Sequence, residues 1–435
     1  MINTLNRVKK WRHIPFVKDT AVMQAGSGFS TFINILASVA FARILLPEKY
    51  GIYSLVFALA GLFALFMNLG TGMATLTLFA DAYEKKDKKE ISRIFVYYLK
   101  VSLIDSLGIG IIAIIISPIV STYMYGAPYV GELVRIIIFS SVLGIFYEMI
   151  SIVFQVIRMI KGYVLLDNFK NFLRISIGFI LVFSLGVFGI LIGYLLSAVI
   201  SLILALIIYS HLSIRYELLP SFKEIKDNWK NVRIRDYFKF SFFISVDQNI
   251  SRLYGILPVL FLSMFFPPET VGYFNIAMKY VSLPLIFLSP VSQLLAVRIP
   301  QLKASRSPLF VRNFFKVSLI SGAIAFFLIV PAVIIAPLAI KFFYGQNYIA
   351  SIGVVYWLMP FTVFSGLAVG LGPLFRTFNK MKEVIIINSL IIAIGVLPSF
   401  YLIKNSGLLG VAIVTVVWSA LSGALPFIYI RKFLR

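Results

Sequence analysis

The sequence predicts an all-α protein that crosses a membrane about twelve times, and three observations indicate this fold class. First, 60% of the 435 residues are hydrophobic and only 13% are charged, whereas soluble domains have about 45–50% apolar and about 25% charged residues. Second, the chain contains twelve apolar stretches of the length that a bilayer requires, about 20 residues each. Third, its basic residues are concentrated on one side of the predicted membrane.

The twelve apolar stretches form two sets of six. The first set lies at roughly 20–42, 52–76, 94–118, 133–157, 165–185 and 188–210. The second set lies at roughly 240–265, 271–297, 315–337, 350–374, 384–403 and 408–430. The fifth stretch is the weakest, because Asp167, Lys170 and Arg174 crowd its start. We therefore expect an N-terminal six-helix lobe at 1–210 and a C-terminal six-helix lobe at 240–435.

The segment 211–239 between the two sets is polar and basic, with Trp229 among lysines and arginines. It is predicted to be an amphipathic cytoplasmic linker on the inner membrane surface, where anionic lipid attracts basic residues.

The distribution of the 40 basic residues gives the orientation. With both termini in the cytoplasm, 32 of them fall on the cytoplasmic side when Lys170 and Arg174 are counted there. Four fall on the opposite side, and Lys100, Arg135, Arg252 and Lys279 fall inside the stretches. This asymmetry is the pattern expected when positive residues stay inside. The net charge of +23 therefore indicates membrane topology, and nucleic acid is not an expected partner.

Several chemistries are excluded by composition. The chain has no cysteine and two histidines, His13 and His211, both in charged flanks, so neither a metal site nor another cofactor is expected. No predicted external loop exceeds about 17 residues, and no nucleophile–base pair is visible, so an enzyme is not expected.

The two halves share short motifs at nearly one offset. Residues 47–51 (Pro-Glu-Lys-Tyr-Gly) match 268–272 (Pro-Glu-Thr-Val-Gly) at an offset of 221, and 186–189 match 407–410 at the same offset. Tyr-Gly followed by tyrosine recurs at 125–129 and 344–348, at an offset of 219. Three matches at equivalent places predict a duplication, in which the halves are related by an axis along the membrane normal.

These motifs resemble those of the polysaccharide (O-antigen type) flippase family. The segment 41–53 is similar to that family's first extracellular turn, and 265–274 is similar to the equivalent turn of the second half. The resemblance covers essentially the whole chain. It implies two six-helix lobes around a central cavity and membership of a superfamily shared with multidrug antiporters and peptidoglycan-precursor flippases.

Polar residues within two matching stretches are the candidate cavity lining. Gln24, Ser27, Thr31 and Asn34 share one helix face, and the offset of 221 places Ser245, Gln248 and Arg252 on the matching face of the seventh stretch. Asn275 and Lys279 share a face in the eighth. Interhelical packing is the alternative interpretation, since small polar residues also serve that purpose in membranes.

Asp247, Arg252 and Lys279 each cost about 2.5–3.5 kcal/mol at the centre of a bilayer. Asp247 and Arg252 are five residues apart, so their side chains point about 140° apart on a helix. Asp247 could instead pair with Lys279. Arg252 then has no obvious partner. This favours the interpretation that Arg252 binds an anionic substrate.

The resemblance implies a flippase that moves a polyprenyl-diphosphate-linked oligosaccharide to the outer leaflet of the cytoplasmic membrane. Arg252 and Lys279 would bind its head group, Gln24, Ser27, Thr31 and Asn34 would hydrogen-bond its hydroxyls, and Gln248 and Asn275 complete the predicted lining. Asp247 is the candidate for coupling to H⁺ or Na⁺. Membrane lipids and other polysaccharide-assembly proteins are the further candidate partners.

The alternative function is a cation-coupled multidrug exporter of the same superfamily. That function requires carboxylates for the coupling ion and for cationic drugs, yet the first stretch contains no central carboxylate.

Reporter fusions test the topology. Fusions at Lys88, at Asn228 and after Arg435 should report a cytoplasmic location, and a fusion at Tyr129 should report the outside. A cytoplasmic signal at Tyr129 would overturn both the assigned stretches and the duplication.

Overall fold

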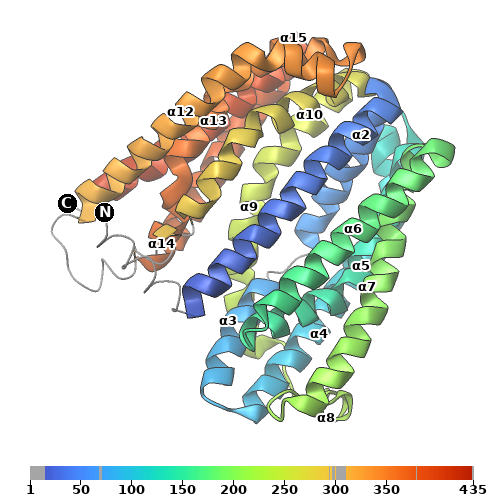
Figure 1. The fold of residues 1–435 in the computed structure, drawn as a ribbon, viewed down its shortest axis with the longest axis vertical. Helices are drawn as coiled ribbons and strands as arrows, with labels where there is room; N and C mark the ends of the chain where they lie inside the picture. The colour runs from blue at the N-terminus through green and yellow to red at the C-terminus, as the bar shows by residue number, and fades with distance from the viewer. Residues whose placement is uncertain are drawn as a thin grey trace, which may run out of the picture. The chain divides into compact units, whose positions relative to one another are not determined.

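The structure is a computed structural model that describes residues 15–67, 71–292, 294, 295, 299, 310–378 and 380–433. Every regular element in these residues is helical, as the sequence predicts (Figure 1). The α-helices are α2 (Pro15–Phe66), α3 (Thr71–Glu84), α4 (Lys88–Tyr125), α5 (Pro128–Val156), α6 (Ile160–Leu185), α7 (Val187–Arg215), α8 (Phe222–Asn228), α9 (Arg235–Phe265), α10 (Pro268–Ser282), α12 (Phe310–Phe343), α13 (Ala350–Leu367), α14 (Leu371–Thr377) and α15 (Met381–Phe433). Short 3₁₀ turns are η1 (Leu283–Leu288), η2 (Gln346–Tyr348) and η3 (Ala368–Gly370).

Nine helices in the described ranges are long and apolar enough to cross a membrane, so the chain is a multi-pass membrane protein. One of them, α15, contains two of the predicted apolar stretches. Another, α2, contains the first stretch and the larger part of the second, whose last residues lie in α3. The seventh predicted stretch lies in α9, a helix of 31 residues that is not among the nine. The number twelve and the cytoplasmic location of both termini stay predictions.

Both long helices are interrupted by one non-helical residue. In α2 the residue is Leu46 (φ 61°, ψ 170°), and Pro47 follows it. Proline is favoured at the first position of a helix because its missing N–H has no partner there anyway. In α15 the residue is Gly407 (φ 51°, ψ −123°). Each long helix is therefore two helices joined by a tight turn, and the predicted turns lie at these breaks.

The matched glycine motifs have the same local geometry in both halves. Gly186 (φ 59°, ψ −131°) has nearly the conformation of Gly407. Three residues later, a Cβ atom on Gly189 would lie 2.3 Å from the carbonyl oxygen of Leu181, and one on Gly410 would lie 2.4 Å from that of Leu402. These contacts are also 221 residues apart. The local agreement supports a duplication, while the arrangement of two pseudo-symmetric lobes stays a prediction.

The chain forms two compact units. The first unit comprises Met1–Ile44, Phe63–Val120 and Gly131–Val246, and the second comprises Leu45–Leu62, Ser121–Val130 and Asp247–Arg435. Two short segments of the N-terminal half therefore pack with the C-terminal half. These units differ in their bounds from the two predicted lobes, 1–210 and 240–435. The division into two six-helix lobes stays a prediction.

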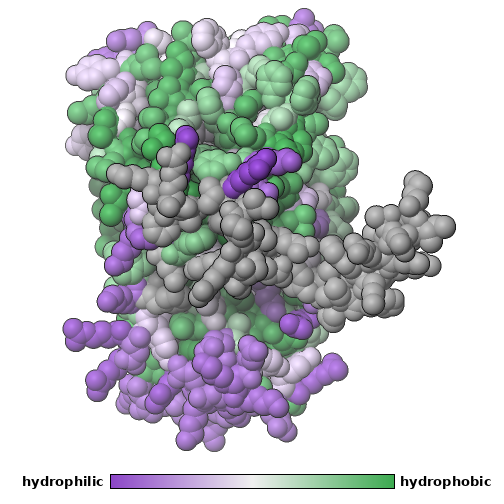
Figure 2. Space-filling model, turned by 90° about the vertical axis from the view of Figure 1, so that its left-hand side faces the viewer, coloured by the Kyte–Doolittle hydropathy of each residue, from purple (hydrophilic) through white to green (hydrophobic). Residues whose placement is uncertain are grey.

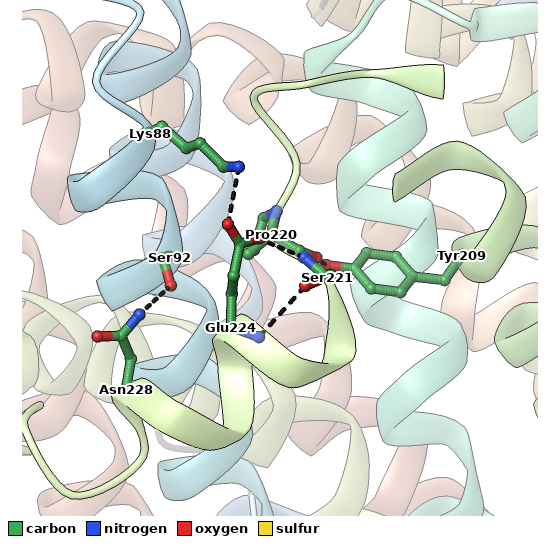
Figure 3. Close-up of polar contacts among 7 residues, drawn as sticks. All are labelled: Lys88, Ser92, Tyr209, Pro220, Ser221, Glu224 and Asn228. Atoms are coloured by element: carbon green, nitrogen blue, oxygen red, sulfur yellow. Dashed lines mark hydrogen bonds and ion pairs between the residues drawn. The ribbon is translucent and has the colours of Figure 1, made fainter. Parts of the chain in front are cut away.

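The linker between the halves is packed onto the first unit through α8. Ser221 and Glu224 form a reciprocal capping box at its start, Lys88 pairs with Glu224 at 2.8 Å, and Asn228 donates to Ser92 at 3.0 Å (Figure 3). The hydrogen bond from Lys88 and the N–H of Ser221 hold the pKa of Glu224 below its usual value. The side chain of Ile225 is buried and packs in the hydrophobic core of the first unit.

Lys100, which the sequence places inside a membrane stretch, also contacts this segment. Its ammonium donates to the carbonyl oxygen of Val232 at 2.9 Å and lies 5.5 Å from the ring centroid of Trp229. The cation is therefore used to attach the linker.

One end of the first unit is strongly hydrophilic. Hydrophilic residues gather at the lower end in Figure 2, where Figure 1 places α8 and the turn between α3 and α4, below a largely hydrophobic surface. Exposed residues there include Lys85, Lys88, Lys223, Lys226 and Lys230. This is the end that the sequence predicts to face the cytoplasm.

Within the second unit, the two Pro-Glu-x-x-Gly turns cross at very short distances. A Cβ atom on Gly51 would lie 1.7 Å from the carbonyl oxygen of Pro268, and one on Gly272 would lie 2.5 Å from the carbonyl oxygen of Pro47. The two contacts are equivalent under the repeat, because the offset of 221 relates Gly51 to Gly272 and Pro47 to Pro268. Only glycine fits at either position, which explains why both motifs end in it.

Replacing Gly51 by alanine should therefore destabilise the protein. The obstructing atoms belong to backbone, which cannot move aside, so we expect a cost of about 1–3 kcal/mol and a lower melting temperature in detergent. The matched control is Gly28→Ala, in the part of α2 before the break at Leu46, where a Cβ atom meets nothing within 4 Å and alanine is favoured. Equal melting temperatures for the two variants would contradict the crossing of the turns.

Candidate functional site

The candidate lining from α2 lies in the first unit. Thr31 donates its hydroxyl to the carbonyl oxygen of Ser27 at 2.8 Å, and the Asn34 amide donates to that of Ser30 at 2.8 Å. The Nε2 atom of Gln24 is buried and has no hydrogen-bond partner in the described part of the chain. Two of the four predicted side chains thus have intrahelical partners, and Gln24 has an unused donor.

Asn34 belongs to a polar network that joins α2, α6 and α7. The Arg174 guanidinium on α6 donates to Asn34 Oδ1, to Asn171 Oδ1 and to the Tyr194 hydroxyl at 3.0 Å. The guanidinium also lies 4.7 Å from the centroid of the Tyr194 ring. Asn171 in turn donates to the Ser30 hydroxyl at 2.7 Å. Arg174 is thus the centre of a site that the sequence interpretation missed.

The acceptors around Arg174 are neutral, so they orient the guanidinium without cancelling its charge. No carboxylate pairs with it in the described part of the chain. One turn earlier, the ammonium of Lys170 lies 3.7 Å from the ring centroid of Tyr147, whose hydroxyl donates to Asp167 at 3.2 Å. With two cations and one carboxylate, this face of α6 is net positive within an apolar helix.

Gln248 and Arg252 lie on α9 in the second unit. Gln248 is partly buried and Arg252 is exposed. No residue whose side chain is described forms a salt bridge with Arg252. The side chain of Asp247 lies outside the described residues, so its proposed roles stay predictions. The cation of Arg252 is consistent with the predicted anion-binding role.

Asn275 and Lys279 lie on α10 and have different surroundings. The ammonium of Lys279 donates to the Tyr50 hydroxyl at 2.6 Å and lies 5.2 Å from the centroid of that ring. Tyr50 belongs to the turn at 47–51, so Lys279 connects α10 to this turn. Asn275 instead lines a cavity, and its amide donates to the carbonyl oxygen of Val271 at 3.1 Å.

The cavity has a volume of about 590 Å³ and lies within the second unit, between α9, α10, α13, α14 and α15. Of the predicted site residues in this unit, Asn275 lines it, whereas Gln248, Arg252 and Lys279 do not. Its other polar and aromatic lining residues include Tyr254, Ser365, Arg376, Asn388, Trp418 and Ser419. None of its lining residues is acidic.

The missed residues share a reason. Arg174 and Arg376 both belong to the basic residues that the sequence assigns to the cytoplasmic side, where the positive-inside pattern explains a cation without a binding site. Trp418 and Tyr254 are two of many aromatic residues in an apolar chain. Only the packing of α9, α10, α13, α14 and α15 shows which rings surround a cavity.

Comparison with known families and proteins gives one family match. Residues 16–303 match the family described as "Polysaccharide biosynthesis protein". Curated proteins give no match.

Solved structures show the same fold at low sequence identity. An inward-facing multidrug resistance MATE family transporter of the MOP superfamily is 17% identical, with a TM-score of 0.70 and coverage of 93% of this chain and 94% of its own. The lipid II flippase MurJ, in an inward closed conformation, is 16% identical, with a TM-score of 0.71 and coverage of 95% and 87%. A MOP superfamily transporter from Pyrococcus furiosus, reported with a reversed binding-pocket polarity, is 16% identical, with a TM-score of 0.63 and coverage of 97% and 96%.

Replacing Arg174 by alanine should lower the stability of the first unit. Asn34, Asn171 and Tyr194 would lose a charged donor, and such hydrogen bonds contribute about 1.5–3 kcal/mol each. Thermal unfolding in detergent measures the change, with Arg233→Ala, an exposed arginine on the linker, as the control. The double variant with Asn34→Ala should lose less than the sum of the single variants. Strict additivity would show that the two side chains do not interact.

Proposed function

Because the chain belongs to the family of polysaccharide biosynthesis proteins, we propose that it is a membrane flippase for a lipid-linked oligosaccharide. Its substrate is a polyprenyl-diphosphate-linked saccharide, which it moves from the cytoplasmic to the outer leaflet of the cytoplasmic membrane. Two lobes that rock against each other would expose the site to each side in turn. The structural similarity to the MATE transporter and to MurJ supports the fold alone, because the sequence identity is low.

The observation that carries the proposal is the presence of cations in apolar helices without paired carboxylates. Arg252 has no salt-bridge partner among the residues whose side chains are described, and Arg174 is held by neutral acceptors. Arg252 lies at the middle of the predicted stretch 240–265, and a charge at the centre of a bilayer costs about 2.5–3.5 kcal/mol. A diphosphate offers the opposite charge, and a guanidinium can bind two of its oxygens at once.

The remaining predicted residues have roles that suit a saccharide. Gln24, Ser27 and Thr31 would hydrogen-bond hydroxyl groups, and Gln248 would add an amide. Asn34 would act with Arg174, since the two are already in contact. Lys279 would bind the head group when its hydrogen bond to the neutral Tyr50 hydroxyl opens.

A cation-coupled multidrug exporter is the second candidate, favoured by the fold shared with the MATE transporter. The cavity of the second unit weighs against it, because its lining includes Arg376 and no acidic residue. A cationic drug would meet repulsion there.

The first test is deletion of the protein followed by analysis of lipid-linked saccharides on each leaflet. The proposal requires one such saccharide to accumulate on the inner leaflet, and an unchanged distribution would contradict it.

Arg252 variants test the proposed diphosphate site. Arg252→Ala should abolish rescue of the deletion, because two charge-assisted hydrogen bonds of about 1.5–3 kcal/mol each would be lost. Arg252→Lys should keep partial activity, since it retains the charge without the planar fork. Arg235→Ala, at the start of the same helix, is the control and should be neutral. Full rescue by a stably inserted Arg252→Ala protein would exclude this residue as the phosphate ligand.

The ion-coupling role of Asp247 has a separate test. Asp247→Asn should leave the protein folded and remove the dependence of transport on a H⁺ or Na⁺ gradient. Asp236→Asn, in the first turn of α9, should retain that dependence. If the Asp247 variant still responds to the gradient as the unmodified protein does, this carboxylate is not the coupling site.

A further inference from the structure

The cavity of the second unit is lined by two kinds of wall. One wall is aromatic, with the Tyr254 and Trp418 rings at right angles and their centroids 5.5 Å apart. Such rings provide flat apolar surfaces, and the tyrosine hydroxyl and the indole N–H at their edges can form hydrogen bonds. The other wall is polar and comes from α10, α13 and α15. Cavities of 300–1,000 Å³ are typical of sites for small organic molecules, and this cavity lies in that range at about 590 Å³.

The polar wall offers both donors and acceptors. Asn275 uses its amide nitrogen within α10, which leaves its carbonyl oxygen as an acceptor. Asn388 accepts from the Tyr254 hydroxyl at 3.3 Å, which leaves its amide nitrogen as a donor. The hydroxyl groups of Ser365 and Ser419 lie 3.4 Å apart. Groups that both donate and accept, such as the hydroxyls of a sugar, match this set.

A single cation lies among the lining residues of the cavity. The guanidinium of Arg376 approaches Gly372, where a Cβ atom would lie 3.4 Å from Nη2. No residue in the described ranges forms a salt bridge with it. Because the lining has no acidic residue, the charge of the cavity is that of this arginine, and it suits an anionic group.

The arginine and the aromatic wall lie at different heights of the bundle. The guanidinium of Arg376 lies beside Gly372, and Gly372 follows Ser365, which contacts Ser419, by seven residues along α13, η3 and α14. At a rise of about 1.5 Å per residue this separation is about 10 Å. A ligand that reaches both must therefore be elongated, with its anionic group at one end and a polar, ring-shaped part at the other.

We propose that this cavity is a sugar-phosphate subsite, in which Arg376 binds a phosphate and the Tyr254–Trp418 wall holds the adjoining sugar ring. This inference rests on the proposed function and deepens it, because it assigns the saccharide part of the substrate to the second unit. Arg376 lies in a segment predicted to face the cytoplasm, so the subsite loads the substrate from the inner leaflet. Arg252 would bind the diphosphate later, at the centre of the membrane.

Trp418 provides a direct probe of this subsite. A protein with Trp11, Trp229 and Trp357 replaced by phenylalanine retains Trp418 alone, since the chain has four tryptophans. The probes are a short-chain prenyl diphosphate that carries one hexose and the same prenyl diphosphate without the sugar. The sugar-bearing probe should change Trp418 fluorescence saturably, and the sugar-free probe should not.

Substitution of Arg376 completes the test. Arg376→Ala should weaken binding of the sugar-bearing probe at least tenfold, which is the loss expected from one charge-assisted hydrogen bond. Arg376→Lys should weaken it less, and it serves as the second variant if the alanine protein does not fold. Arg431→Ala, near the end of α15, is the control and should bind normally.

Three outcomes would overturn the subsite. An equal response to both probes would show that the aromatic wall does not recognise the sugar. Unchanged affinity in a folded Arg376→Ala protein would remove the phosphate contact. No response to either probe, in a protein that still translocates the full substrate, would overturn the subsite and leave the proposed function intact. Saturable binding in a protein without translocation would instead contradict the proposed function.

Discussion

A charged side chain in an apolar helix must find water, a partner or a ligand, because leaving it alone in lipid costs about 2.5–3.5 kcal/mol. The protein meets this constraint in different ways. Lys100 attaches the linker through a backbone carbonyl and Trp229, and Lys279 attaches α10 to the first turn through Tyr50. Arg174 is surrounded by neutral acceptors that orient it. Under the proposed function, an anionic substrate binds where a cation has no paired carboxylate among the described side chains, as at Arg174 and Arg252.

The crossing of the two glycine-ended turns is a second constraint on the second unit. Backbone meets backbone at Gly51 and Gly272, so the turn at 47–51 is held against the start of α10. Tyr50 extends this contact to Lys279 and to Tyr348, whose ring is 6.2 Å away and perpendicular. Movement of the first turn would therefore break the contact between Tyr50 and Lys279.

The sequence predicts the helical fold, the multi-pass topology and the repeated turns, because hydrophobicity and glycine geometry are local properties. Helical spacing places Thr31 and Asn34 on one face of α2, and the role of that face in lining a cavity stays a prediction. The roles of Arg174 and Arg376 were not predictable, because a basic residue that is counted on the cytoplasmic side is already explained by topology. The cavity around Trp418 depends on how five helices pack, and no spacing along the chain encodes that arrangement. The same limit applies to the linker, whose apolar residues pack against the first unit.

The most direct measurement of the proposed function is translocation by the purified protein in lipid vesicles. A fluorescent polyprenyl-diphosphate oligosaccharide is placed in both leaflets, and a membrane-impermeant quencher reports the fraction that reaches the outside over time. If the protein is a flippase, the accessible fraction exceeds that of empty vesicles, and a prenyl diphosphate without sugar does not move at the same rate. An accessible fraction equal to that of empty vesicles, with folded protein and an imposed H⁺ or Na⁺ gradient, would contradict the proposal.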